Sequence, residues 1–114
     1  MIIDDQNIFM EGLSALLKTY EEVEVMSTAE NGQVALEKMR LQEPDVIILD
    51  YEMPVMDGEK TAIEVVKRFP KVKIIILSMY DETQLIANLF DIGIHSFLPK
   101  NCDGDQLIDA IEVV

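Results

Sequence analysis

Polar side chains follow four short apolar stretches of this sequence, each at the point where the stretch ends. They belong to Asp4 and Asp5, Asp50, Ser78 and Lys100. Carboxylates that lie close together raise one another's pKa, so three of them need a cation to stay ionised. Carboxylate oxygens suit Mg²⁺, while an ammonium and a hydroxyl can bind anionic oxygen. If the fold brings these groups together, the sequence predicts phosphoryl chemistry on the Asp50 carboxylate.

The elements that must position these residues alternate along the chain. Short runs of branched apolar residues predict strands, and apolar residues at helical spacing between them predict helices. The predicted strands cover residues 2–3, 24–28, 45–50, 72–78 and 95–98. The predicted helices cover residues 9–20, a segment that Asn31 caps, 58–69, a segment from 81 or 82 to 93, and 103–114. The third and fourth strands are continuously apolar, which requires helices on both sides of the sheet.

This alternation predicts an α/β doubly wound sandwich of the flavodoxin-like kind, with five strands and a parallel sheet in the order 2-1-3-4-5. In such sheets the ligand site lies beyond the carboxyl ends of the strands. Neighbouring strands are about 4.8 Å apart, so the polar side chains at their ends should converge. A single Asp at a strand end is usually a turn-former or a helix cap, and Asp4-Asp5 alone could be either. The complete set is what favours a functional site.

The composition limits the class of protein. The chain has 114 residues, 49% of them hydrophobic, which suits one domain with one packed core. No apolar run can span a bilayer and no leader follows Met1, while the single Cys102 is typical of a reducing compartment, so we expect a cytoplasmic protein. The formal net charge of −13 repels phosphate backbones and anionic lipid, so we expect neither nucleic-acid nor membrane binding by this segment.

The fourth predicted helix has two apolar stripes, and only one of them is needed for the core. The stripe that can supply the core side consists of Ile86, Phe90 and Gly93. The second stripe consists of Leu85, Leu89 and Ile92. The second stripe is either a surface for a partner or partly buried core.

Two other classes of protein use a similar sheet edge. A phosphatase of the haloacid dehalogenase type needs a second Asp two residues after the nucleophile and usually a Thr or Val two residues later, but this chain has Glu52 and Pro54 and lacks room for a cap domain. A flavodoxin-like FMN carrier needs a Ser/Thr/Gly-rich loop after the first strand, where Asp4-Asp5-Gln6 would repel the phosphate. Turnover of p-nitrophenyl phosphate would favour the first class, and a coloured protein the second.

Four dispersed motifs resemble the receiver domain of bacterial two-component response regulators. They are "DD" at Asp4-Asp5, "ILDYEMPVMDG" around Asp50, "IIILS" ending at Ser78, and "FLPK" ending at Lys100. The resemblance covers nearly the whole chain, and the motifs stand in the order that the family has. The segments "DDQNIFMEGLSALL" and "LSMYDE" are most similar to the subgroup whose regulators carry a LuxR-type helix-turn-helix output. The resemblance implies a regulatory phosphoacceptor rather than a metabolic enzyme.

The resemblance also implies which kind of protein supplies the phosphoryl group and which residues bind the metal ion. Asp50 would accept the group from a phosphohistidine of a sensor histidine kinase. Asp5 and Asp50 would ligate Mg²⁺ together with the backbone carbonyl of Glu52, and Asp4 would act through a metal-bound water. Residues 1–114 would form a single receiver domain, cut from a longer protein whose output domain is absent and would carry any DNA contact.

A switch is implied by the remaining positions. Lys100 would pair with the acceptor carboxylate and then with the phosphoryl group, and Ser78 would move toward it. Phe97 would rotate into the space that Ser78 leaves and remodel the face of the fourth helix, last strand and last helix. A partner, or a second copy of the chain as a homodimer, would dock on that face after phosphorylation.

Several positions depart from the commoner family pattern. Glu52 adds an acid beside the pocket, and Phe97 lacks the hydroxyl of the more frequent tyrosine. Asn101 stands where many members have proline, which puts the cis peptide typical there in doubt. Met79 replaces a small residue, and from its bulk we predict slow loss of the phosphoryl group.

Overall fold

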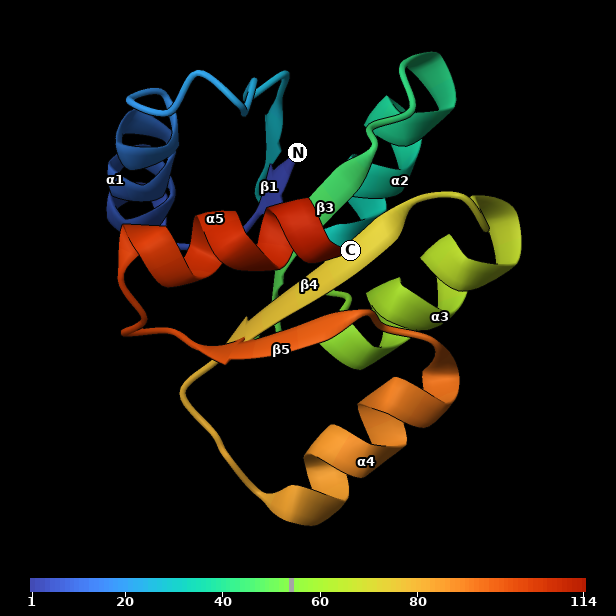
Figure 1. The fold of residues 1–114 in the computed structure, drawn as a ribbon. Coiled ribbons are helices and arrows are strands. Elements are labelled where there is room, and N and C mark those ends of the chain that lie inside the picture. Colours follow the sequence, from blue (N-terminus) through green and yellow to red (C-terminus); the bar gives the residue numbers. More distant parts are fainter. Residues whose placement is uncertain (54) are drawn as a thin grey trace.

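The computed structural model describes residues 1–53 and 55–114, in which five parallel strands and five helices alternate (Figure 1). Pro54 therefore lies outside the described residues. The strands are β1 (Ile2–Ile3), β2 (Thr28–Ala29), β3 (Val46–Asp50), β4 (Lys73–Ser78) and β5 (Ser96–Pro99). The helices are α1 (Asn7–Leu17), α2 (Gly32–Leu41), α3 (Gly58–Arg68), α4 (Thr83–Ile92) and α5 (Gly104–Val113). The sheet order is β2-β1-β3-β4-β5, which confirms the predicted topology.

Alternate residues of the central strands point into two separate cores. Ile48 of β3 and Ile75 of β4 pack with the helices α1 and α5 on one face of the sheet. Leu49 and Ile76 pack with α2, α3 and α4 on the other face (Figure 1). Because successive side chains of a strand point to opposite faces, a continuously apolar strand is buried on both sides. The two central strands are thereby held rigidly between two layers of helix.

Side-chain caps fix the start of three helices. The Asn31 carboxamide accepts a hydrogen bond from the Val34 backbone N–H, and the Asp57 carboxylate accepts one from the Lys60 N–H. Asp103 begins α5 with a reciprocal capping box, in which Gln106 also takes part. Each cap satisfies a backbone donor that the helix itself leaves unpaired. These three caps confirm the helix starts expected from the sequence.

The prediction for β2 was wrong in its bounds. Residues 24–28 were expected to form the strand, but β2 is only Thr28–Ala29. β1 offers two partners, with Ile2 opposite Thr28 and Ile3 opposite Ala29. A parallel strand exists only where its neighbour supplies hydrogen-bonding groups, so the apolar alternation before Thr28 does not become strand.

The structure decides between the two alternatives for the second apolar stripe of α4. Leu89 is completely buried and Leu85 and Ile92 pack beside it, whereas Phe90 is 45% exposed. The helix ends at Gly93, which has φ +126, and the next residue, Ile94, is buried in the core. Both stripes are apolar, so helical periodicity could not choose between them. The alternative that the second stripe is buried core is therefore confirmed, whereas the expectation that Phe90 lies on the core side was wrong.

None of the described helices is both long enough and apolar enough to cross a membrane.

Candidate functional site

The carboxyl ends of four strands bring the predicted polar side chains to one edge of the sheet. Asp50 ends β3 and Ser78 ends β4, while Asp4 and Lys100 directly follow β1 and β5. The parallel register pairs Asp50 with Leu77 and Ser78 with Pro99, so the strands end almost level with one another. The Lys100 backbone N–H donates to the Ser78 carbonyl oxygen at 2.9 Å, which continues the pairing of β4 and β5 to the edge of the site.

Three of these strand ends are closed by the same kind of turn. The Asp4 carboxylate accepts a hydrogen bond from the Gln6 backbone N–H at 2.8 Å. The Asp50 carboxylate likewise accepts from Glu52 at 3.1 Å, and the Ser78 hydroxyl accepts from Tyr80 at 2.9 Å. Short polar side chains commonly bind the backbone two residues ahead in this way. One oxygen of each carboxylate is used by the turn, and the other is left for the site.

Lys100 binds the remaining oxygens of both buried aspartates. Its Nζ lies 3.3 Å from Asp50 Oδ2 and 3.5 Å from Asp4 Oδ2. Asp4 and Asp50 are each only 2% exposed, so these charges are shielded from bulk water. Buried charges need such partners, because removal from water strongly penalises an isolated ion. Lys100 therefore compensates part of the negative charge gathered at the edge of the sheet.

The environment of Asp50 makes its carboxyl group unusually basic. Burial, together with the negative charge of Asp4, raises the pKa of Asp50 from 3.8 to about 6. The hydrogen bond from Glu52 and the positive charge of Lys100 act in the opposite direction but do not cancel the effect of burial on that pKa. A cation bound nearby, or a reaction partner that neutralises the negative charge, would favour the ionised form of Asp50. This is the form that can act as a nucleophile.

Asp4, Asp5 and Asp50 form a group that could hold a metal ion. One carboxylate oxygen of each lies within 4.8 Å of the others, and Asp5 is exposed to solvent while the other two are buried. An all-oxygen, carboxylate-rich set with access to water fits Mg²⁺. The Glu52 carboxylate does not belong to this group among the described residues. A metal contact through the Glu52 backbone carbonyl stays a prediction.

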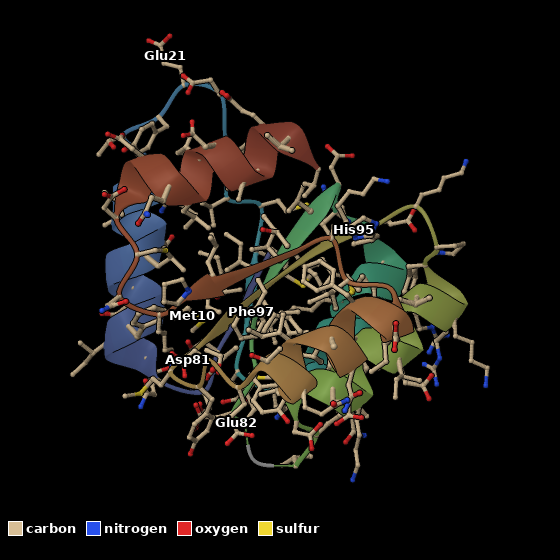
Figure 2. All side chains as sticks on the ribbon, turned by 60° about the horizontal axis from the view of Figure 1, so that its bottom comes forward. Met10, Glu21, Asp81, Glu82, His95 and Phe97 are labelled. Carbon is tan, nitrogen blue, oxygen red and sulfur yellow. The ribbon has the colours of Figure 1, made fainter. Side chains whose placement is uncertain are left out.

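Ser78 and Phe97 lie on adjacent strands but in different surroundings. Ser78 is buried at the end of β4, and its hydroxyl accepts a hydrogen bond from the Tyr80 backbone N–H. Phe97 is half-buried on β5 and packs against the core on the side of the sheet that α4 covers (Figure 2). The Lys100–Asn101 bond is trans, since the described residues contain no cis peptide. The coupled movement of Ser78 and Phe97 stays a prediction.

Two residues that contact Lys100 were not predicted from the sequence. A hydrogen bond from the backbone to the His95 side chain was not predicted either. The Gln6 carboxamide oxygen and the Phe9 ring both lie beside the Lys100 ammonium. Lys100 follows them by more than ninety positions, so no local pattern could have indicated these contacts. His95 accepts a hydrogen bond from the Ile74 backbone N–H through Nδ1 and so extends the pairing of β4.

The fold and this site define a class of protein, and comparison with known sequences agrees. The family described as the response regulator receiver domain matches residues 1–112. The chain therefore belongs to the receiver domains of two-component response regulators. This result confirms the family expected from the four motifs.

Particular relatives point to the same subgroup. The transcriptional regulatory protein DegU of Brevibacillus brevis is 35% identical over 114 residues, covering all of this chain and 48% of DegU. The receiver domain of NarL from Mycobacterium tuberculosis is 30% identical with a TM-score of 0.92, covering 98% of this chain and 90% of that one. A LuxR-family DNA-binding response regulator from Staphylococcus aureus has a TM-score of 0.90 at 26% identity, covering 98% and 94%. The chain spans about half the length of the curated relatives it matches.

Proposed function

We propose that Asp50 is the phosphoacceptor of this receiver domain. A carboxylate oxygen of Asp50 attacks phosphorus, and the new O–P bond forms as the P–N bond of a phosphohistidine on a sensor histidine kinase breaks. The electron pair of the broken bond stays on the imidazole, and the product is an acyl phosphate. The observation that carries this proposal is the buried Asp50 carboxylate, paired with Lys100 at 3.3 Å beside two further aspartates. Lys100 would neutralise one phosphoryl oxygen and Ser78 would donate to another.

We further propose that Asp5 and Asp50, with the Glu52 backbone carbonyl, hold Mg²⁺ directly and that Asp4 acts through a bound water. Such an ion would offset the negative charge of the incoming phosphoryl group. The spacing of the three carboxylates supports this assignment. Catalysis by the chain would be limited to its own phosphorylation and dephosphorylation.

The phosphoryl group would act by shifting a population between two packings of the domain. Ser78 would leave its hydrogen bond with Tyr80 to reach the phosphoryl group, and Phe97 would move toward the vacated space. New contacts made in only one packing would then favour it. We propose that this change, on the face of α4, β5 and α5, controls a transcriptional output domain outside residues 1–114, in the cytoplasm.

The test is intact mass after incubation with acetyl phosphate and Mg²⁺. We expect a gain of one phosphoryl group, about 80 Da, in the wild type. The gain should be absent in Asp50→Asn and in wild type treated with EDTA. An adduct of the same size in Asp50→Asn would place the acceptor elsewhere. No adduct in the wild type, with bound Mg²⁺ verified by titration, would contradict the proposed phosphoacceptor chemistry.

Met79 should slow the loss of the phosphoryl group. It directly follows Ser78 and is 76% exposed, so we expect its flexible side chain to obstruct the approach of water to the site only partly. We expect Met79→Ala to shorten the lifetime of the acyl phosphate roughly threefold, which is a modest change in barrier. The decay of the phosphorylated mass after removal of the donor measures it. An unchanged lifetime would remove Met79 from this role.

Dimerisation on phosphorylation is a further proposal, and the exposed Phe90 of α4 is its apolar anchor. α4 carries one acidic residue, Asp91, and no basic one, and the chain has a formal net charge of −13, so salt that screens the repulsion between two copies should favour association. Light scattering with beryllofluoride and Mg²⁺ at 0.3 M NaCl should show a doubled mass that Phe90→Ala abolishes. A monomer under these conditions would contradict the proposal.

A further inference from the structure

Lys100 is held by two neutral side chains as well as by the acidic ones. Its Nζ donates to the Gln6 carboxamide oxygen at 3.1 Å and lies 4.7 Å from the centroid of the Phe9 ring. The other contacts are the carboxylates of Asp50 and Asp4. Three oxygens match the three N–H donors of an ammonium, and the ring covers a further side of the charge.

The neutral and the acidic contacts of Lys100 respond differently to phosphorylation of Asp50. The carboxylate partner at Asp50 changes when that side chain carries a phosphoryl group. Gln6 and Phe9 do not change charge, and both come from the start of α1. Gln6 is tied to the site by its backbone hydrogen bond to Asp4, and Phe9 packs against the core between α1 and α5. Their positions are therefore set by the fold rather than by the reaction.

Lys100 lies beside an open space, so contacts that restrict its side chain influence where its ammonium group points. A pocket of about 310 Å³ lies between α1 and the segment that follows β5, and Phe9, Leu77 and Cys102 line it together with Lys100. A lysine has a flexible four-carbon stem, so an open space lets it adopt other rotamers. The ring of Phe9 and the carboxamide of Gln6 favour the rotamer that points to Asp50.

We propose that Gln6 and Phe9 are positioning residues that hold the Lys100 ammonium toward the phosphoryl site. This inference rests on the proposed phosphoacceptor role of Asp50. A cation over an aromatic face at a partly exposed site gives a stabilisation that corresponds to about a two- to fivefold change in rate. Gln6 is exposed, so the loss caused by its removal should be the smaller one.

The decisive comparison is between Phe9→Leu and Phe9→Tyr. Leucine keeps an apolar side chain against the core but removes the aromatic face, whereas tyrosine keeps the face. We expect Phe9→Leu to lower the initial rate of phosphoryl uptake from acetyl phosphate about two- to fivefold, and Phe9→Tyr to match the wild type. Gln6→Ala should also be slower than the wild type. Melting temperatures of all variants identify any loss that comes from unfolding.

A second measurement separates this inference from the proposed function. In the unphosphorylated protein, the NMR signals of the Lys100 ε-methylene protons should carry a ring-current shift that Phe9→Leu abolishes and Phe9→Tyr keeps. Absence of this shift in the wild type would overturn the inference whether or not Asp50 is phosphorylated. With the shift present, an undiminished rate in Phe9→Leu, or an equal loss in Phe9→Tyr, would overturn it as well. Failure of the wild type to gain a phosphoryl group would instead count against the function of Asp50.

Discussion

Gly58→Ala should lower the free energy of unfolding by about 2–3 kcal/mol, the cost typical of inserting a methyl group where no space exists. A Cβ at position 58 would lie 2.6 Å from the Cα of Tyr51 and 2.8 Å from the carbonyl oxygen of Asp50. Both atoms are backbone at the end of a central strand, so neither can rotate away. The Gly58 N–H also donates to the Tyr51 carbonyl at 2.9 Å, so the clash acts where helix and strand are already joined.

Gly12→Ala is the matched control for this substitution. Position 12 lies within α1, and a Cβ there would meet nothing within 4 Å. Alanine is favoured over glycine in a helix by roughly 0.5–1 kcal/mol, so this variant should be more stable than the wild type. Urea unfolding followed by circular dichroism measures both variants. Equal stability of Gly58→Ala and the wild type would mean that α3 does not pack closely on the end of β3.

Asp50→Asn should raise the free energy of unfolding at pH 8 in the absence of Mg²⁺ by about 1–2 kcal/mol, although we expect it to abolish phosphorylation. Burial raises the folded-state pKa of Asp50 to about 6, above its usual value of 3.8. The folded protein therefore binds this proton more tightly than the unfolded chain. The contribution of this bound proton to the free energy of unfolding is fully present below pH 4 and is lost as the pH rises through about 6. Asparagine avoids this loss because it is neutral, although it weakens the pairing with Lys100.

Urea unfolding at pH 5 and pH 8, with EDTA present, tests the effect of Asp50. The advantage of Asp50→Asn over the wild type should grow from pH 5 to pH 8. Asp109→Asn on the exposed surface of α5 is the control, because it removes one negative charge away from the site. An equal gain in both variants would assign the effect to net charge rather than to the burial of Asp50. Destabilisation by Asp50→Asn at pH 8 would show that the pair with Lys100 outweighs the cost of burial.

The site could be predicted because its residues lie at strand ends. Asp50 and Lys100 are far apart in the sequence, but each directly follows an apolar run, and parallel strands bring such positions together. Topology therefore supplied their proximity without any knowledge of side-chain geometry. The same reasoning could not find Gln6 and Phe9, because contact with Lys100 depends on the rotamer of a flexible side chain.

The length of a strand and the rotation of a helix were less predictable where they depend on a neighbouring element. The alternation before Thr28 suits a strand, but the extent of β2 is set by what β1 can pair with. The two stripes of α4 are similarly apolar, and tertiary packing buries the one that contains Leu89. Local sequence gives the type of an element, while tertiary contacts decide its length and rotation.

The burial of β3 and β4 has a consequence for amide hydrogen exchange. Backbone N–H groups of strands packed on both faces exchange only when the whole domain unfolds, whereas exposed loops exchange through local opening. Ile76 is fully buried, but Met79 and Tyr80, which follow the same strand, are 76% and 52% exposed. The boundary between slow and fast exchange therefore falls at Ser78. A ligand that orders the loop after Ser78 would be detected as new protection in the fastest-exchanging amides, with those of the central strands as an internal reference for global stability.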